Sequence, residues 1–171
     1  MARAHWRVPR GPAHFLEVDH VLVKMVLYLP RDAASVPVSR QVLDGCLHTL
    51  GVTAQTRTDI ALALTEACAN VIKHAGPGDE YEVTAKAVDG KCVIEVVNNG
   101  EGAMTAVPTG GMPPVLAEQG RGLKIMDAVV DNLRLTSGER DGTTVHFEKN
   151  LQWVPGAAGQ HLSAGDGDGG G

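Results

Sequence analysis

The chain has 171 residues and 43% of them are hydrophobic, which predicts a single folded domain with a substantial core. Its formal net charge is −5, and it contains no basic run interleaved with aromatic residues, so direct nucleic-acid binding is not expected. No apolar run approaches the roughly 20 residues that a membrane-spanning helix needs, and no signal-peptide pattern opens the chain. We therefore expect a cytoplasmic protein with no membrane contact.

The cysteines and histidines do not follow a metal-binding pattern. Cys46, Cys68 and Cys92 are odd in number, show no C-x-x-C spacing and fall within apolar segments, so we expect reduced, packed thiols. The seven histidines lack the spacing of a zinc site.

Three parts are predicted along the chain: a flexible N-terminal lead-in over residues 1–18, one folded domain over 19–154, and a disordered glycine-rich tail over 155–171. The apolar run at residues 21–29 predicts a strand that ends at Pro30. A helix follows, with Asp32 or Ser35 as its N-cap, and Gly51 ends it. The expected buried stripe of this helix is Val38, Val42, Leu43, Cys46, Leu47 and Leu50.

A second, longer helix carries a polar stripe on an apolar body. It begins after Thr53 and ends at the breaker residues 75–78. Glu66, Asn70 and His74 recur every fourth residue and therefore share one face of the helix. The core-facing residues are predicted to be Ile60, Leu64, Ala67, Val71 and Ile72. A carboxylate and a carboxamide on a buried helix suit metal–phosphate chemistry, although the same pattern also occurs as the polar edge of an ordinary helix.

Two strands at residues 81–88 and 92–97 are predicted to form a hairpin that turns at Asp89 and Gly90. The second strand runs into Asn98, Gly100 and Gly102, where the glycines allow a flat base to approach the backbone; a simple turn is the alternative. The glycine- and proline-rich residues 103–119 are either a lid over a ligand or a plain connector.

A turn at Gly120, Arg121 and Gly122 opens a short helix over residues 123–130. The free amide groups of such a helix start attract phosphate, while a tight turn is again the alternative. Strands at residues 132–137 and 143–151 complete the domain. The sequence contains no complete P-loop or dinucleotide-binding glycine motif.

The order of these elements predicts an α+β fold. Strand, two helices, hairpin, short helix and two strands do not alternate as a doubly wound parallel sheet requires. We expect a two-layer α/β sandwich, with a mixed, mostly antiparallel sheet and helices on one face.

The helix with Glu66 and Asn70, the turn after Asn98 and the turn at Gly120 occur in an order that resembles the GHKL superfamily of ATP-binding domains. That superfamily includes gyrase, Hsp90, histidine-kinase and MutL ATPase domains. Within it, the chain most resembles the bacterial anti-sigma-factor serine/threonine kinases, over about residues 22–151. The three segments are similar to the N box, the first glycine box and the second glycine box of the family.

The resemblance implies that the chain binds ATP and Mg²⁺. It assigns Glu66 as general base and Asn70 as metal ligand. The residues that it places around the nucleotide are Asn70, Lys73, His74, Asn98, Gly100, Gly102, Gly120, Arg121, Gly122, Leu123 and Thr144. Asn98 stands where the family has an aspartate that reads the adenine amino group. An asparagine oxygen can also accept that bond, although without the negative charge.

The resemblance further implies a homodimer that binds a sigma factor and phosphorylates a serine or threonine of an anti-sigma antagonist protein. Two alternatives remain open on the sequence. One is an ATP-binding regulatory switch with little or no kinase activity, and the other is a stand-alone ATPase.

Overall fold

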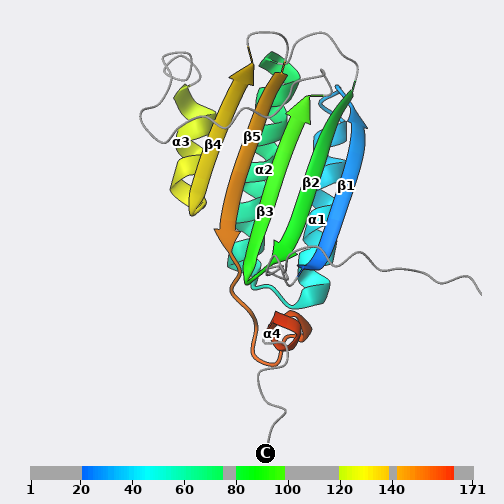
Figure 1. The fold of residues 1–171 in the computed structure, drawn as a ribbon, viewed down its shortest axis with the longest axis vertical. Coiled ribbons are helices and arrows are strands. Elements are labelled where there is room, and N and C mark those ends of the chain that lie inside the picture. The colour runs from blue at the N-terminus through cyan, green and yellow to red at the C-terminus, as the bar shows by residue number, and fades with distance from the viewer. Residues whose placement is uncertain (1–20, 75–79, 99–119, 139–141, 164–171) are drawn as a thin grey trace, which may run out of the picture.

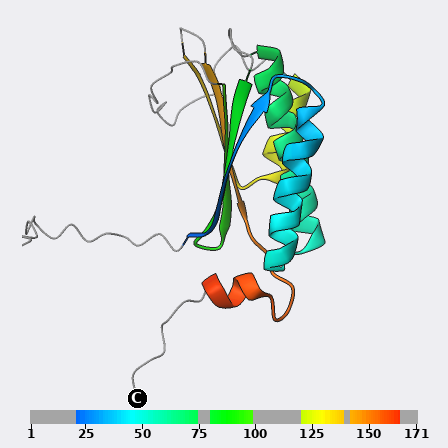
Figure 2. The same ribbon diagram turned by 90° about the vertical axis from the view of Figure 1, so that its right-hand side faces the viewer.

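The computed structural model describes residues 21–74, 80–98, 120–138 and 142–163. A five-stranded sheet forms one layer, and helices α1, α2 and α3 cover one of its faces (Figures 1 and 2). The elements are β1 (Val21–Pro30), α1 (Ser35–Leu50), α2 (Ala54–His74), β2 (Glu80–Val88), β3 (Lys91–Asn98), α3 (Gly120–Val129), β4 (Asn132–Gly138), β5 (Gly142–Asn150) and α4 (Ala158–Ser163). The predicted α+β sandwich is confirmed.

The strand order is β1-β2-β3-β5-β4. Each neighbouring pair of these strands is antiparallel. The prediction of a mostly antiparallel sheet is confirmed, but the described part of the sheet contains no parallel pair, so it is not a mixed sheet. The hairpin between β2 and β3 turns where the sequence placed it. Asp89 has φ 46° and Gly90 has φ 74°, which is the backbone of a two-residue turn that matches the strand twist.

The core lies between the sheet and the helices. On β2 and β3 every second side chain is buried, as a strand with one covered face requires. Val83 lies opposite Val96, and both are fully buried. From α2 the side chains of Ile60, Leu64 and Val71 enter this core, as the sequence predicted.

Helix α1 ends at Gly51, whose φ of 84° is the left-handed conformation that glycine favours. Two residues of the predicted buried face of α1 are wrong, because Val38 is 49% exposed and Val42 is 41% exposed. Leu43 and Leu47 are buried as predicted, and Ser35 and Ser39 are buried with them. The physical reason is polar satisfaction, because a buried tyrosine hydroxyl needs a partner. Ser35 Oγ lies 2.7 Å from the hydroxyl of Tyr81.

The C-terminal segment folds under the helices rather than trailing away. The amide of Thr53 donates to the Gln152 carbonyl at 2.8 Å, and that of Val154 donates to the Gly51 carbonyl at 2.8 Å. Helix α4 follows and lies at the lower end of the molecule in Figure 1. The prediction of a disordered tail is therefore wrong for residues 155–163, because small residues there allow close packing. Residues 164–171 and the lead-in at 1–18 lie outside the described residues.

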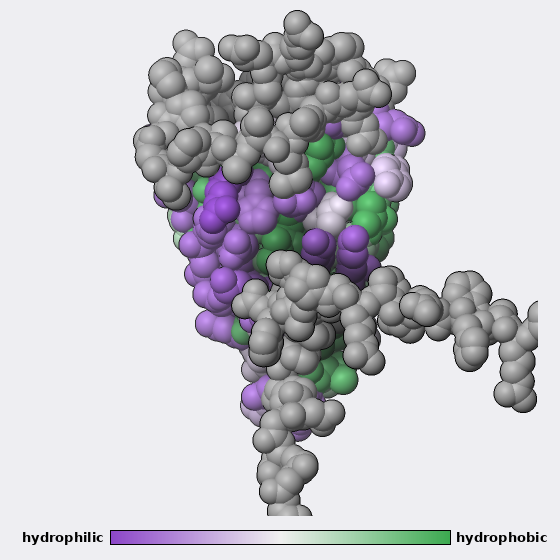
Figure 3. Space-filling view, viewed as in Figure 1, coloured by the Kyte–Doolittle hydropathy of each residue, from purple (hydrophilic) through white to green (hydrophobic). Residues whose placement is uncertain are grey.

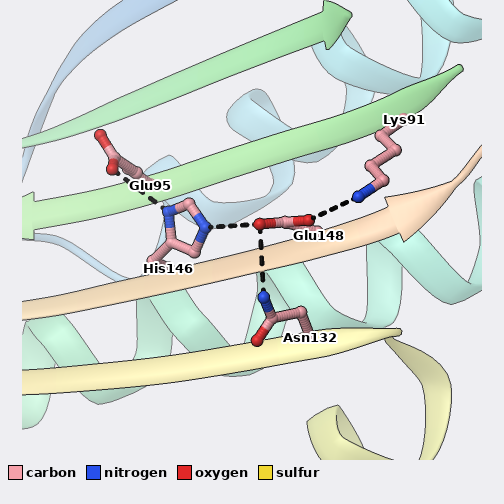
Figure 4. A network of polar contacts seen from close by, with 5 residues as sticks. All are labelled: Lys91, Glu95, Asn132, His146 and Glu148. Carbon is pink, nitrogen blue, oxygen red and sulfur yellow. Dashed lines mark hydrogen bonds and ion pairs between the residues drawn. The ribbon is translucent and has the colours of Figure 1, made fainter. Parts of the chain in front are cut away.

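No helix of the described residues covers the second face of the sheet, and the character of this face differs from one side to the other. Hydrophilic side chains gather over β4 and β5, whereas apolar ones are more frequent toward β1 (Figure 3). His146 lies between two carboxylates, with Nδ1 3.2 Å from Glu95 Oε1 and Nε2 3.4 Å from Glu148 Oε1 (Figure 4). Lys91 and Asn132 also donate to Glu148, so one polar network joins β3, β5 and β4.

The three cysteines are free, as predicted. Burial raises the pKa of Cys68 to about 11 and that of Cys92 to about 12, so both thiols stay protonated at neutral pH. Among the residues that the structure covers, no helix is both long enough and apolar enough to cross a membrane.

Candidate functional site

Three elements bring their ends together at the upper end of the molecule in Figure 1. Helix α2 reaches this end with its C-terminus, α3 starts there, and β3 finishes there. The two helices pack side by side and run in opposite directions. As a result, the polar stripe of α2 meets the first turn of α3, although about fifty residues separate them in the sequence.

Gly122 is the point of closest approach between these helices. A Cβ atom built on Gly122 would lie 2.6 Å from Oε2 of Glu66 and 3.9 Å from Oδ1 of Asn70. Both α2 side chains therefore face the start of α3. Glu66 is half-buried and Asn70 is only 8% exposed, so these two residues of the polar stripe lie between α2 and α3 rather than on an open helix edge.

Asn70 has an unmet bonding capacity in this position. Its Nδ2 atom is buried and has no hydrogen-bond partner among the residues that the structure places. Such an orphaned donor costs about 1–3 kcal/mol, and a ligand that accepts its hydrogen bond would remove that cost. The oxygen of the same amide lies toward α3, where an oxygen ligand for a hard cation would be needed.

The residues present fit Mg²⁺ as part of a larger assembly. The described parts of the chain hold no group of three or more ligating side chains of the His, Cys, Asp or Glu type. A divalent ion beside Asn70 would therefore take most of its ligands from water and from phosphate oxygens. Mg²⁺ is commonly bound in this way, by one or two protein oxygens together with substrate phosphates.

The first turn of α3 supplies the features of an anion-binding helix start. Its leading amide groups have no partner within the helix, and the helix dipole favours negative charge there. Arg121 is exposed in this turn and adds a positive charge. Leu123 is buried in the core at 4% exposure, so only its backbone can face a ligand.

Asn98 ends β3 on the face of the sheet that the helices cover. It is fully buried and lies opposite Tyr81 of β2. Burial raises the pKa of Tyr81 to about 12, although the hydrogen bond with Ser35 acts in the opposite direction and lowers that pKa. Asn98 therefore lies beside a phenol that stays neutral at physiological pH.

The strand register of β5 contradicts the prediction that Thr144 lies near the base. Thr144 lies opposite Val97, and Val97 points to the uncovered face because it alternates with Asn98. Thr143 precedes it and shares the covered face with Val145. The assignment of Thr144 to the base is thus on the wrong side of the sheet, and Thr143 is the threonine on the side of Asn98.

The remaining predicted residues are placed only in part. Lys73 is exposed near the end of α2, and His74 is the last residue of that helix. Gly100 and Gly102 lie outside the described residues, as does the expected lid at 103–119. No sequence pattern indicated Arg31, whose Nη2 donates to the carbonyl of Ile72 at 3.0 Å and thereby caps the end of α2.

The relatives of this chain among known proteins include bacterial serine-protein kinases. The chain is 25% identical to the serine-protein kinase RsbW of Bacillus mycoides and 27% identical to that of Bacillus cereus. Each match spans 139 residues, which are 75% of this chain and 86% of the relative.

A solved structure shares the fold. The crystal structure of the RsbU and RsbW domains of Rv1364c from Mycobacterium tuberculosis matches with a TM-score of 0.59 and 21% identity. The match covers 75% of this chain and 32% of that longer one.

A family described as the histidine kinase-like ATPase domain matches residues 29–149. This segment runs from the end of β1 to the end of β5 and contains Glu66, Asn70, Asn98 and Gly122. The chain therefore belongs to the histidine kinase-like ATPase domain family.

Proposed function

We propose that this protein is an ATP-dependent protein serine/threonine kinase of the anti-sigma-factor type. The observation that carries the proposal is the apposition of Glu66 and Asn70 on α2 with Gly122 at the start of α3. A general base, a metal-ligating oxygen and a phosphate-binding helix start are the parts that phosphoryl transfer needs in one place. The relatives that carry the name serine-protein kinase support the same activity.

Each residue then has a defined task. The amide groups of the first turn of α3, with Arg121, hold the phosphates, and Asn98 reads the base through its amide. Asn70 would hold Mg²⁺, which when bound neutralises phosphate charge. Glu66 takes the proton of a serine or threonine hydroxyl while the oxygen of that hydroxyl bonds to the γ-phosphorus of ATP. The bond between the γ-phosphorus and the oxygen that bridges it to the β-phosphorus breaks, and ADP leaves.

The partners belong to the proposal as well. By analogy with the RsbW relatives, the protein would act in the cytoplasm as a homodimer, bind a sigma factor and phosphorylate a small antagonist protein. These partners rest on family likeness rather than on any surface of this chain.

A second candidate is an ATP-binding switch that does not transfer phosphate. Asn98 favours it, because an uncharged amide in place of a carboxylate changes how the base is held. Glu66 opposes it, since a protein that only binds ATP needs no carboxylate beside the start of α3.

Labelled ATP, Mg²⁺ and a candidate antagonist protein separate the two functions. The kinase predicts label on the antagonist and a loss of about 10²–10⁴-fold in Glu66→Ala, the usual contribution of a general base. Calorimetry should show that Glu66→Ala still binds ATP, whereas Asn70→Ala loses Mg²⁺-dependent affinity. Binding without transfer in the unaltered protein would support the switch, and equal Mg²⁺-dependent binding by Asn70→Ala would contradict the role given to Asn70.

A further inference from the structure

Gly122 differs from the other glycines of the described chain in what surrounds it. A Cβ atom on Gly122 would come within 2.6 Å of Glu66 Oε2, a separation that real Cβ contacts essentially never show. The same atom would lie 3.9 Å from Asn70 Oδ1, which is ordinary van der Waals contact. A side chain at position 122 would therefore displace Glu66 but not Asn70.

Backbone conformation does not explain this glycine. The glycines with positive φ in the described residues are Gly51, Gly90 and Gly156, and Gly122 is not among them. It occupies a right-handed helix, where glycine is the least favourable residue apart from proline. The structure gives a reason for tolerating that cost, because any side chain here would enter the volume that the Glu66 carboxylate occupies.

We infer that Gly122 is a positioning residue for Glu66: the missing side chain reserves the place of the carboxylate at the start of α3. This inference rests on the proposed kinase function and deepens it. In Gly122→Ala the carboxylate must shift by several tenths of an ångström, since it is the flexible end of its side chain and the helix backbone is not. The amide of Asn70 keeps its position.

The expected consequence is a separation of binding from transfer. A misplacement of about 1 Å in a reacting group can cost about 100-fold in rate. We therefore expect Gly122→Ala to lower kcat for phosphoryl transfer by about 10- to 100-fold. The KM for ATP and the calorimetric affinity for ATP with Mg²⁺ should stay within about threefold, because the Asn70 side of the site is not displaced.

Gly45→Ala is the matched control. Gly45 lies within α1, and a Cβ atom there would meet nothing within 4 Å. This variant makes the same chemical change in a helix without touching Glu66, so it should transfer phosphate at the rate of the unaltered protein.

A stability cycle gives a readout that does not depend on activity. Urea unfolding of Gly122→Ala, Glu66→Ala and the double variant measures whether the two sites interact. The inference predicts that Gly122→Ala is less destabilising when Glu66 is already alanine, because the clash has been removed.

The outcomes distinguish this inference from the proposed function. If the unaltered protein transfers no phosphate to any antagonist, the kinase proposal fails, while coupling of the two sites in the unfolding cycle would still support the positioning role. If the unaltered protein transfers and Gly122→Ala matches its kcat, the inference is overturned. A raised KM with unchanged kcat would also overturn it, since Gly122 would then act on the phosphates alone.

Discussion

The two ends of the helical layer both contain a helix glycine in a crowded place, but the neighbours are different. At the upper end, Gly122 of α3 faces the tip of the flexible Glu66 side chain. At the lower end, a Cβ atom on Gly159 of α4 would run into the Trp153 ring and would lie 2.9 Å from the Leu50 carbonyl oxygen. The Trp153 ring is partly buried and packs against the core, and a backbone atom cannot move aside, so neither contact yields as easily as the end of a flexible side chain. The same residue type therefore leaves room for chemistry at one end and for close packing at the other.

The polar groups at the two ends follow the same division. At the lower end, the turn after α1 and the segment after β5 satisfy each other through backbone hydrogen bonds at Gly51 and Thr53. At the upper end, Asn70 Nδ2 is buried without a partner in the described structure. The lower end is therefore better satisfied than the described part of the upper end, a difference that the proposed ligand site would explain.

The largest effect on stability is expected from Gly159→Ala. Overpacking of a close contact costs about 1–3 kcal/mol, and neither the Trp153 ring nor the Leu50 carbonyl can yield cheaply. Urea unfolding should show a lower midpoint with an unchanged slope, while phosphate transfer per folded molecule stays the same. A loss of transfer without a loss of stability would mean that the lower end is coupled to the site, and the division drawn above would be wrong.

Asn98→Asp tests the opposite end through ligand affinity. A carboxylate accepts from the adenine amino group more strongly than an amide does, so ATP should bind about 5- to 30-fold more tightly, a difference of about 1–2 kcal/mol. The free protein should be less stable, because Asn98 is fully buried and a charge there must be desolvated. Calorimetry with ATP and thermal unfolding without it measure the two effects. Unchanged affinity would show that Asn98 does not contact the base.

Thr143→Val and Thr144→Val form a matched pair on opposite faces of β5. Each replaces a hydroxyl by a methyl group of similar shape. We expect Thr143→Val to weaken ATP binding by about fivefold, the equivalent of about 1 kcal/mol for one hydrogen bond, and Thr144→Val to leave it unchanged. The reverse result would restore the assignment made from the sequence and would contradict the strand register.

Much of the sheet and the helix order could be predicted, because their signals are local. The alternating pattern of β2 and β3, the turn at Asp89 and the stop at Gly51 each depend on a few neighbouring residues. The sequence could not show which side chains of α1 and β5 face the core. Ser35 is buried because of a tyrosine 46 positions away, and two consecutive threonines give no sign of which one faces the helices.

The candidate site and the C-terminal segment both depend on contacts that sequence patterns do not predict. Periodicity placed Glu66 and Asn70 on one face of a helix, but only the packing of α2 against α3 shows that Gly122 lies against them. The residues after Pro155 have the composition of a linker, yet α4 packs because Gly159 fits against the Trp153 ring and the carbonyl of Leu50, which is far away in the sequence. Contacts between remote segments decide both outcomes, and composition does not report them.

The smallest expected effect lies at neither helix glycine but on the other face of the sheet, in the network of Figure 4. Although burial opposes it, hydrogen bonds from His146 and Lys91 hold the pKa of Glu148 below its usual range. A carboxylate whose pKa is lower in the folded state contributes stability above its unfolded pKa and loses that contribution as the pH falls through the folded value. Glu148→Gln should therefore cost up to about 1 kcal/mol at pH 7, and progressively less as the pH falls through the lowered pKa of Glu148. Lys91→Met should reduce this pH-dependent effect of Glu148→Gln, because it removes one of the groups that lower the pKa of Glu148.

Unfolding curves recorded from pH 3 to pH 8 measure the loss of unfolding free energy in Glu148→Gln, and ATP affinity at pH 7 should not change. A Glu148→Gln deficit that persists at pH 3 would locate its origin in lost packing rather than in charge, and a change in ATP affinity would show that the uncovered face of the sheet communicates with the upper end.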